Sequence, residues 1–156
     1  MMAQITDIAA LEASHPETFH DVLRFWADRS PDAPALMSET AEPLSYAELL
    51  RVIGDVGAAL NGRGFGRGDR IAIVHPGGID LAAALVALWS HSTVIPLGPK
   101  LRLGEYAMYL RDIRADAIVI PAGMDTPARV AAEQLHLPIL TLTRQTTDET
   151  GRIQLE

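Results

Sequence analysis

The side chains that could do chemistry in this sequence are five histidines and a scatter of carboxylates, with no cysteine among them. The histidines are His15, His20, His75, His91 and His136. None stands four residues from another, the spacing that puts two metal ligands on one helix face, so a metal site would need convergence of distant segments. We therefore expect no metal site. Without cysteine we also expect no disulfide, no thiolate zinc site and no cysteine nucleophile.

Two glycine-rich segments invite a phosphate-binding interpretation. The segment GRGFGRGDR, residues 62–70, follows an expected helix and precedes an expected strand. The dinucleotide fingerprint has the opposite order, so a helix stop explains these glycines better. The segment HPGG, residues 75–78, does follow a strand, and its backbone N–H groups could hold an anion. Pro76 removes one donor and no Ser or Cys nucleophile flanks the segment, which favours a structural turn.

The charged residues do not point to an active site. Asp112 and Asp116 alternate with Arg111 and Arg114, a pattern typical of a solvated helix end. The phosphate-loop pattern G-x-x-x-x-G-K-[ST] is absent, because the only lysine, Lys100, is followed by Leu. The residue chemistry alone therefore predicts no catalytic residue.

Composition limits the class of protein. The 156 residues suit one domain, and a formal net charge of −7 disfavours nucleic acid as a partner. No positively charged leader precedes an apolar run at the N-terminus. The longest apolar stretch, residues 79–89, is shorter than the roughly 20 residues that span a bilayer. We expect a soluble, cytoplasmic protein with no membrane span.

The first half of the sequence predicts helices that lead into a small hairpin. Residues 1–16 are expected to be a loosely ordered leader. Thr18 can cap a helix that should stop before Pro31. Residues 33–46 contain two short apolar runs around a polar turn, which indicates a hairpin. Ser45 and Glu48 then form a capping box for a second helix, which ends near Gly62.

The second half alternates short β-branched runs with helical patterns. The expected strands are residues 70–75, 92–97, 116–122 and 138–143, and the expected helices are residues 79–90, 103–113 and 126–136. Such alternation predicts an α/β fold of βαβαβαβ units, with a mostly parallel sheet flanked by helices. Residues 144–156 are a polar tail in which RIQL forms an edge strand or frays.

Four phrases stand in an order that resembles the opening of adenylate-forming enzymes. They are RSPDAPAL, LSYAEL, GDRIAI and VIPLGPKL, and the resemblance runs from about residue 18 to residue 120. This superfamily contains acyl-CoA synthetases, peptide-synthetase adenylation domains and luciferases. Two places depart from its pattern. Ser90-His91-Ser92 replaces a small residue and Gly, and Gly98 replaces Asn or Asp.

The resemblance implies a two-step reaction for a complete enzyme. ATP with Mg²⁺ converts a carboxylic acid to an acyl-adenylate, and a thiol then takes the acyl group, with CoA favoured over a carrier protein. The family's phosphate loop, adenine-binding segment, acid pocket and catalytic lysine all lie beyond the matching region. Residues 17–143 are thus expected to be an incomplete N-terminal subdomain, inactive alone, with no tightly bound cofactor and the remainder of the ligase as its partner.

The resemblance also suggests one role for individual residues. In some CoA ligases a basic residue in the last phrase lies near the phosphates of CoA. Lys100 occupies that position and Arg102 is close by, so both are candidate CoA-phosphate contacts. The alternative is that they are solvated loop cations.

Two other interpretations stay open. The chain could be a stand-alone, non-catalytic binding or regulatory protein derived from this fold, which self-associates through an exposed sheet edge. It could also be an unrelated flavodoxin-like domain that binds a nucleotide at its strand ends.

Overall fold

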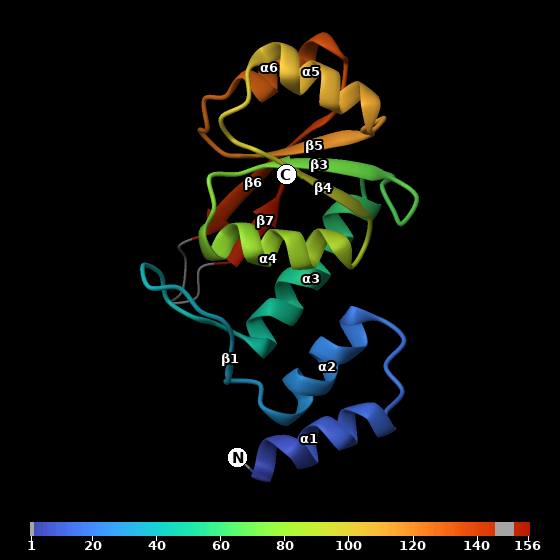
Figure 1. Ribbon diagram of the computed structural model, residues 1–156, viewed down its shortest axis with the longest axis vertical. Coiled ribbons are helices and arrows are strands. Elements are labelled where there is room, and N and C mark those ends of the chain that lie inside the picture. The colour runs from blue at the N-terminus through green and yellow to red at the C-terminus, as the bar shows by residue number, and fades with distance from the viewer. Residues whose placement is uncertain (1, 146–151) are drawn as a thin grey trace.

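The computed structural model describes residues 2–145 and 152–156 of the chain (Figure 1). Its N-terminal part consists of α1 (Met2–Ala13), which lies within the range expected to be a loose leader, and α2 (Phe19–Arg29). The predicted cap of α2 is confirmed: the Asp21 N–H donates to Thr18 Oγ1 at 3.2 Å, and the Thr18 N–H donates to Asp21 Oδ2 at 2.9 Å. The helix ends before Pro31, as expected.

The hairpin and the second capping box are also confirmed. Strands β1 (Pro34–Leu36) and β2 (Leu44–Ser45) pair antiparallel and lead into α3 (Tyr46–Asn61). Ser45 Oγ accepts the Glu48 N–H at 3.3 Å, and Glu48 Oε2 accepts the Ser45 N–H at 2.8 Å. Each such cap is worth about 1 kcal/mol, so α3 starts at a residue that local chemistry defines.

A five-stranded sheet organises the rest of the molecule. Its strands are β3 (Arg70–Val74), β4 (Thr93–Leu97), β5 (Ala117–Pro121), β6 (Ile139–Gln145) and β7 (Arg152–Leu155). The spatial order is β4-β3-β5-β6-β7, parallel except for the antiparallel β7. The predicted α/β fold with a mostly parallel sheet is confirmed, and RIQL forms the edge strand β7.

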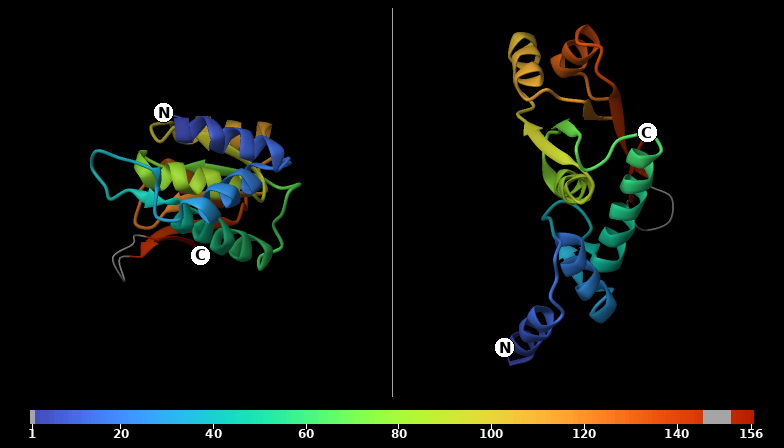
Figure 2. Two further views of the ribbon diagram at one scale, coloured as in Figure 1. Left: turned by 90° about the horizontal axis from the view of Figure 1, so that it is seen from below. Right: turned by 90° about the vertical axis from the view of Figure 1, so that its right-hand side faces the viewer.

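Helices cover both faces of this sheet (Figures 1 and 2). α4 (Gly78–Trp89) and α3 lie on one face, and α5 (Leu103–Asp112) and α6 (Pro127–Gln134) lie on the other. The chain runs from β3 to β4 in one direction and from β4 to β5 in the other. Right-handed crossovers therefore place α4 opposite α5 and α6.

Strand β3, which lies between β4 and β5, supplies both cores by simple alternation. Ile71 and Ile73 belong to the cluster under α3 and α4, whereas Ala72 and Val74 belong to the cluster under α5 and α6. All four are fully buried. Such a strand shows a continuous apolar run in the sequence, because it is covered on two faces.

Asp116 corrects one expectation about the charged residues. Its Oδ2 accepts the N–H of Arg70 at 2.8 Å, and its own N–H donates to the Arg70 carbonyl, also at 2.8 Å. This pair of bonds joins the starts of β3 and β5. Asp116 is exposed, yet it sets the register of two strands and is not only part of a solvated face.

Candidate functional site

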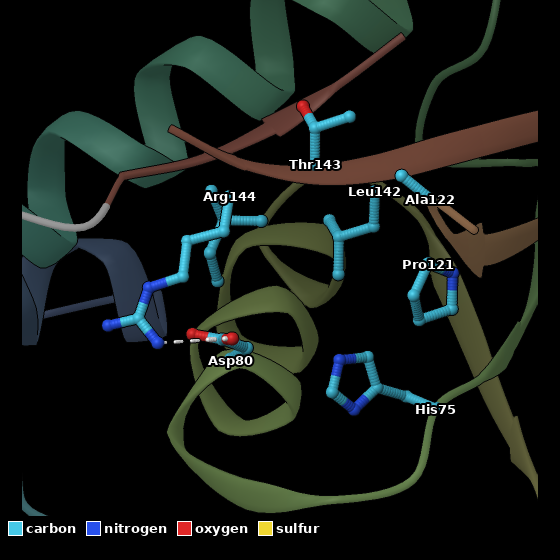
Figure 3. Close-up of a pocket in the computed structure, with 8 residues that line it drawn as sticks. His75, Asp80, Pro121, Ala122, Leu142, Thr143 and Arg144 are labelled. Carbon is cyan, nitrogen blue, oxygen red and sulfur yellow. Dashed lines mark ion pairs between the residues drawn. The ribbon is translucent and has the colours of Figure 1, made fainter. Parts of the chain in front are cut away.

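The carboxyl edge of the sheet holds a pocket of about 160 Å³ (Figure 3). The strand order reverses between β3 and β5, and open α/β sheets bind ligands outside the carboxyl ends of strands at such a switch point. The pocket lies beside that point. Its lining residues are His75, Asp80, Pro121, Ala122, Leu142, Thr143, Arg144 and Ile153.

His75 follows β3 directly, and its ring points into the pocket in Figure 3. Its Nδ1 accepts the N–H of Gly77 at 3.1 Å, so neutral His75 carries its proton on Nε2. Gly77 and Gly78 have φ values of 127° and 85°, which other residues rarely adopt. Burial lowers the pKa of His75, and the Asp80 carboxylate opposes this effect. The HPGG segment is thus a turn whose histidine side chain is part of its structure.

Asp80 and Arg144 form an ion pair at one side of the pocket (Figure 3). Arg144 Nη1 lies 3.5 Å from Asp80 Oδ2, with 40% and 28% of the two side chains exposed. The pair joins the first turn of α4 to the end of β6. Solvent screens it, so its contribution to stability is about 1 kcal/mol or less.

Two features of the sequence point to this ion pair, although neither belongs to a motif. Asp80 is the only charge in the apolar helix α4, and Arg144 directly follows the expected strand 138–143. Both positions fall at the carboxyl edge of a parallel sheet, where polar groups gather. What the sequence could not supply was the adjacency of α4 and β6.

The pocket does not fit a divalent metal ion. Among the described residues that line it, Asp80 is the only carboxylate and is already paired with Arg144, whereas Mg²⁺ requires several oxygen ligands. Elsewhere in residues 2–145 and 152–156, no three His, Asp or Glu side chains gather as a metal site would need. The structure brings together only His20 and His91 of the five histidines, in a separate groove.

Lys100 and Arg102 lie at the same edge of the sheet but outside the pocket. They follow β4, an edge strand, and both side chains are exposed. The Arg102 N–H donates to Glu105 Oε2 at 2.7 Å, which starts α5. The buried Tyr106 donates its hydroxyl to the Gly98 carbonyl at 2.7 Å, which fastens the loop that carries both cations.

The sequence was compared with known proteins. Residues 23–154 match the family described as AMP-binding enzyme. The phenyloxazoline synthase MbtB of Mycolicibacterium paratuberculosis (strain ATCC BAA-968 / K-10) is 36% identical over 124 residues, which cover 79% of this chain and 10% of that protein. The probable CoA ligase CCL9 of Humulus lupulus is 24% identical over 127 residues, covering 81% and 24%.

Solved structures share the fold. A putative long-chain-fatty-acid CoA ligase from Rhodopseudomonas palustris CGA009 superposes with a TM-score of 0.66 at 21% identity, covering 85% of this chain and 34% of that one. FadD1, a long-chain-fatty-acid-CoA ligase from Archaeoglobus fulgidus, gives 0.66 at 19% identity, covering 80% and 26%.

In the part of the chain that the structure describes, no helix is both long and apolar enough to cross a bilayer. The chain spans about a tenth of MbtB and about a quarter of CCL9. The match over residues 23–154, with the shared fold, shows that this chain belongs to the AMP-binding, adenylate-forming enzyme family and corresponds to a short N-terminal portion of it.

Proposed function

We propose that this chain is the N-terminal part of a ligase that activates a carboxylic acid with ATP and passes the acyl group to a thiol. In the first step a carboxylate oxygen attacks the α-phosphorus of ATP, and pyrophosphate leaves. In the second step the thiol attacks the acyl carbon, and AMP leaves. The observation that carries the proposal is the family match over residues 23–154.

This chain by itself is expected to be inactive. Charge builds on phosphate oxygens during adenylation, so catalysis depends on groups that stabilise this charge. The pocket of about 160 Å³ is smaller than the 300–1,000 Å³ typical of ligand sites, and its arginine already faces Asp80. The sequence has no phosphate-loop pattern. Mg-ATP should therefore bind weakly or not at all.

We favour CoA as the acceptor. Lys100 and Arg102 are exposed beside the carboxyl end of β4, and neither forms an ion pair within residues 2–145 and 152–156. Two such cations can contact phosphate groups without first losing a protein partner. Their loop is anchored by Tyr106, which limits the entropy cost of binding.

A carrier-protein acceptor is the second candidate. The relative with 36% identity is named as a phenyloxazoline synthase, and another match, at 26% identity, is named Nonribosomal peptide synthetase 8, from Aspergillus fumigatus. Peptide synthetases hold their acyl groups on carrier-protein pantetheine. The CoA ligase named above is only 24% identical.

Calorimetric titration of this chain with Mg-ATP, and then with CoA, tests the proposal. We expect no tight binding of either ligand. Tight binding of ATP at one site per chain would contradict the proposal and favour the flavodoxin-like nucleotide-binding domain. If neither ligand binds and the solution mass shows a defined dimer, the interpretation as a stand-alone regulatory protein would be favoured.

The acceptor is tested in an active ligase that contains this chain. Lys100→Ala and Arg102→Ala should raise the KM for CoA, whereas Arg111→Ala, an exposed cation at the other end of α5, should not. An unchanged KM for CoA in both variants would remove the assigned role. Transfer to a carrier protein but not to CoA would select the second candidate.

A further inference from the structure

A second groove lies far from the carboxyl-edge pocket, where the start of α2 meets the loop after α3 and the turn after α4. Its volume is about 470 Å³. His20, Asp21, Arg67 and His91 are among the residues that line it. The groove therefore brings two imidazoles from distant parts of the sequence to one surface, with an arginine and a carboxylate.

His91 is fixed against α3. Its Nε2 lies 2.9 Å from the backbone carbonyl of Ile53. A carbonyl only accepts, so Nε2 carries a proton and neutral His91 has a bare Nδ1. The ring can approach so closely because Gly57 has no side chain: a Cβ there would lie 2.4 Å from the ring.

His20 is held by its own helix. Arg24 Nη2 lies 3.2 Å from His20 Nε2, one turn further along α2. A guanidinium only donates, so His20 Nε2 accepts and the neutral ring carries its proton on Nδ1. That Nδ1 is buried, and the structure shows no hydrogen-bond partner for it among the described residues.

A second proton on His20 has no favourable place. It must bind Nε2, which ends the hydrogen bond from Arg24 and leaves two cations 3.2 Å apart. Arg67 adds positive charge, and Asp21 is the only carboxylate among the described residues that line the groove. One oxygen of Asp21 already accepts the Thr18 hydroxyl at 2.7 Å. Burial, then Arg24, lower the pKa of His20; Asp21 raises it and His91 lowers it.

Arg24 lies on α2 with His20, so the repulsion that acts across the groove comes from Arg67, and few apolar contacts of α2 oppose it. Only Leu23 and Ala27 of α2 are buried, and the Trp26 ring stacks on Tyr46 with centroids 6.2 Å apart. Elements with few buried contacts open locally at a fraction of the global unfolding free energy. The sheet, in contrast, has fully buried apolar runs in the neighbouring strands β3 and β5.

We propose that the docking of α2 on α3 is a proton-sensitive contact, in which protonation of His20 loosens α2 and opens the groove while the sheet stays folded. His20 acts as the sensor, Arg24 as the cation that opposes its charge, and His91 as the fixed neighbour across the groove. Acidification from about pH 7.5 to about pH 5 crosses the range in which histidine titrates.

Trp26 reports the docking directly. In a Trp89→Phe background Trp26 is the only tryptophan of the full chain. We expect a reversible red shift of its emission on acidification, centred below pH 6.5, while far-UV circular dichroism keeps most of its signal. Loss of both signals together would mean global acid unfolding and would overturn the proposal, as would a flat emission profile.

Variants assign the titrating group. His20→Gln keeps an acceptor for Arg24 but does not titrate, and it should abolish the transition. Arg24→Gln removes the opposing cation and should move the midpoint to higher pH, by about half a unit for an exposed charge pair. His136→Asn, at an exposed histidine after α6, should change nothing. An unchanged transition in His20→Gln, or a midpoint in Arg24→Gln that stays or falls, would overturn the proposal.

Discussion

The ring of His91 occupies the space that a side chain at Gly57 would need. A Cβ at Gly57 would lie 2.4 Å from two atoms of the ring, and the ring's Nε2 donates to the Ile53 carbonyl one turn earlier in α3. The turn after α4 is thus held against α3, because the His91 ring packs into the space that the missing side chain of Gly57 leaves open.

Gly57→Ala should destabilise the protein by about 1–3 kcal/mol, because the added methyl group must displace His91 from a packed site. Urea unfolding measures this. Gly54→Ala is the matched control: nothing lies within 4 Å of its Cβ position, so a mid-helix alanine should stabilise by about 0.5–1 kcal/mol. An equal change in the free energy of unfolding for the two variants would show that the His91 ring does not occupy the space beside Gly57.

Adding His91→Ala to Gly57→Ala should recover part of the loss, because the clash disappears along with the hydrogen bond. The two changes should therefore be strongly non-additive, as expected for residues in contact. A double-mutant cycle from urea unfolding gives the coupling energy. If the free-energy changes of the two single variants simply add in the double variant, the contact between Gly57 and His91 is contradicted.

The folded protein should lose stability as the pH falls below about 6.5. His20 and His75 have pKa values below the usual one in the folded state, so the unfolded chain binds more protons in this range. Their contribution is present above the unfolded pKa and is lost on acidification towards the folded pKa. His75→Gln should reduce the loss between pH 7.5 and pH 5.5, by less than about 1 kcal/mol for a half-exposed ring. An identical pH slope in this variant would exclude His75.

Tyr106→Phe should cost about 1 kcal/mol, because it removes the hydroxyl that donates to the Gly98 carbonyl at 2.7 Å. The matched control is Tyr109→Phe, one turn along α5, where the ring is 40% exposed. That change should be close to neutral. In an active ligase, Tyr106→Phe should also loosen the loop of Lys100 and raise the KM for CoA. Equal free energies of unfolding of the two variants in urea would contradict a stabilising hydrogen bond between Tyr106 and Gly98.

The β4 edge of the sheet should resist pairing with a second chain. The Thr93 N–H donates to the Asp69 carbonyl at 2.9 Å, so the alternate residues Val94 and Pro96 turn their backbone groups outward. Pro96 has no N–H to offer, and the Val94 carbonyl accepts Trp89 Nε1 at 3.4 Å. Edge prolines are a common protection against aggregation.

Pro96→Val combined with Trp89→Phe should therefore increase self-association, by about tenfold if one or two edge hydrogen bonds become available. Sedimentation velocity over a concentration series measures it. Pro99→Val, beyond the end of the strand, is the control and should not change association. Unaltered sedimentation of the double variant would indicate that this edge is not protected in the way described.

Features with local causes could be predicted from the sequence. Thr18 with Asp21 and Ser45 with Glu48 are three residues apart, so their hydrogen bonds follow once a helix begins there. The strand Arg70–Val74 follows from its β-branched run, because a strand buried on both faces must be apolar throughout. The family follows from phrases that keep their order along the chain.

The site could be predicted only in part. The position of His75 after a strand indicated the correct edge of the sheet, and the turn interpretation agrees with its bond to Gly77. The pairing of Asp80 with Arg144 could not be found, because it depends on α4 and β6 lying side by side. The sequence does not reveal the role of Asp116 for the same reason, since its partner Arg70 lies on another strand.

The sequence by itself thus determined where helices start, which runs form strands, and the family. These properties depend on neighbours within a few positions or on the order of phrases along the chain. The tertiary structure alone decided the strand order, the Asp80–Arg144 ion pair and the packing of the His91 ring against Gly57. These contacts join residues far apart in the chain, and only the closing of a packed core brings such residues within bonding distance.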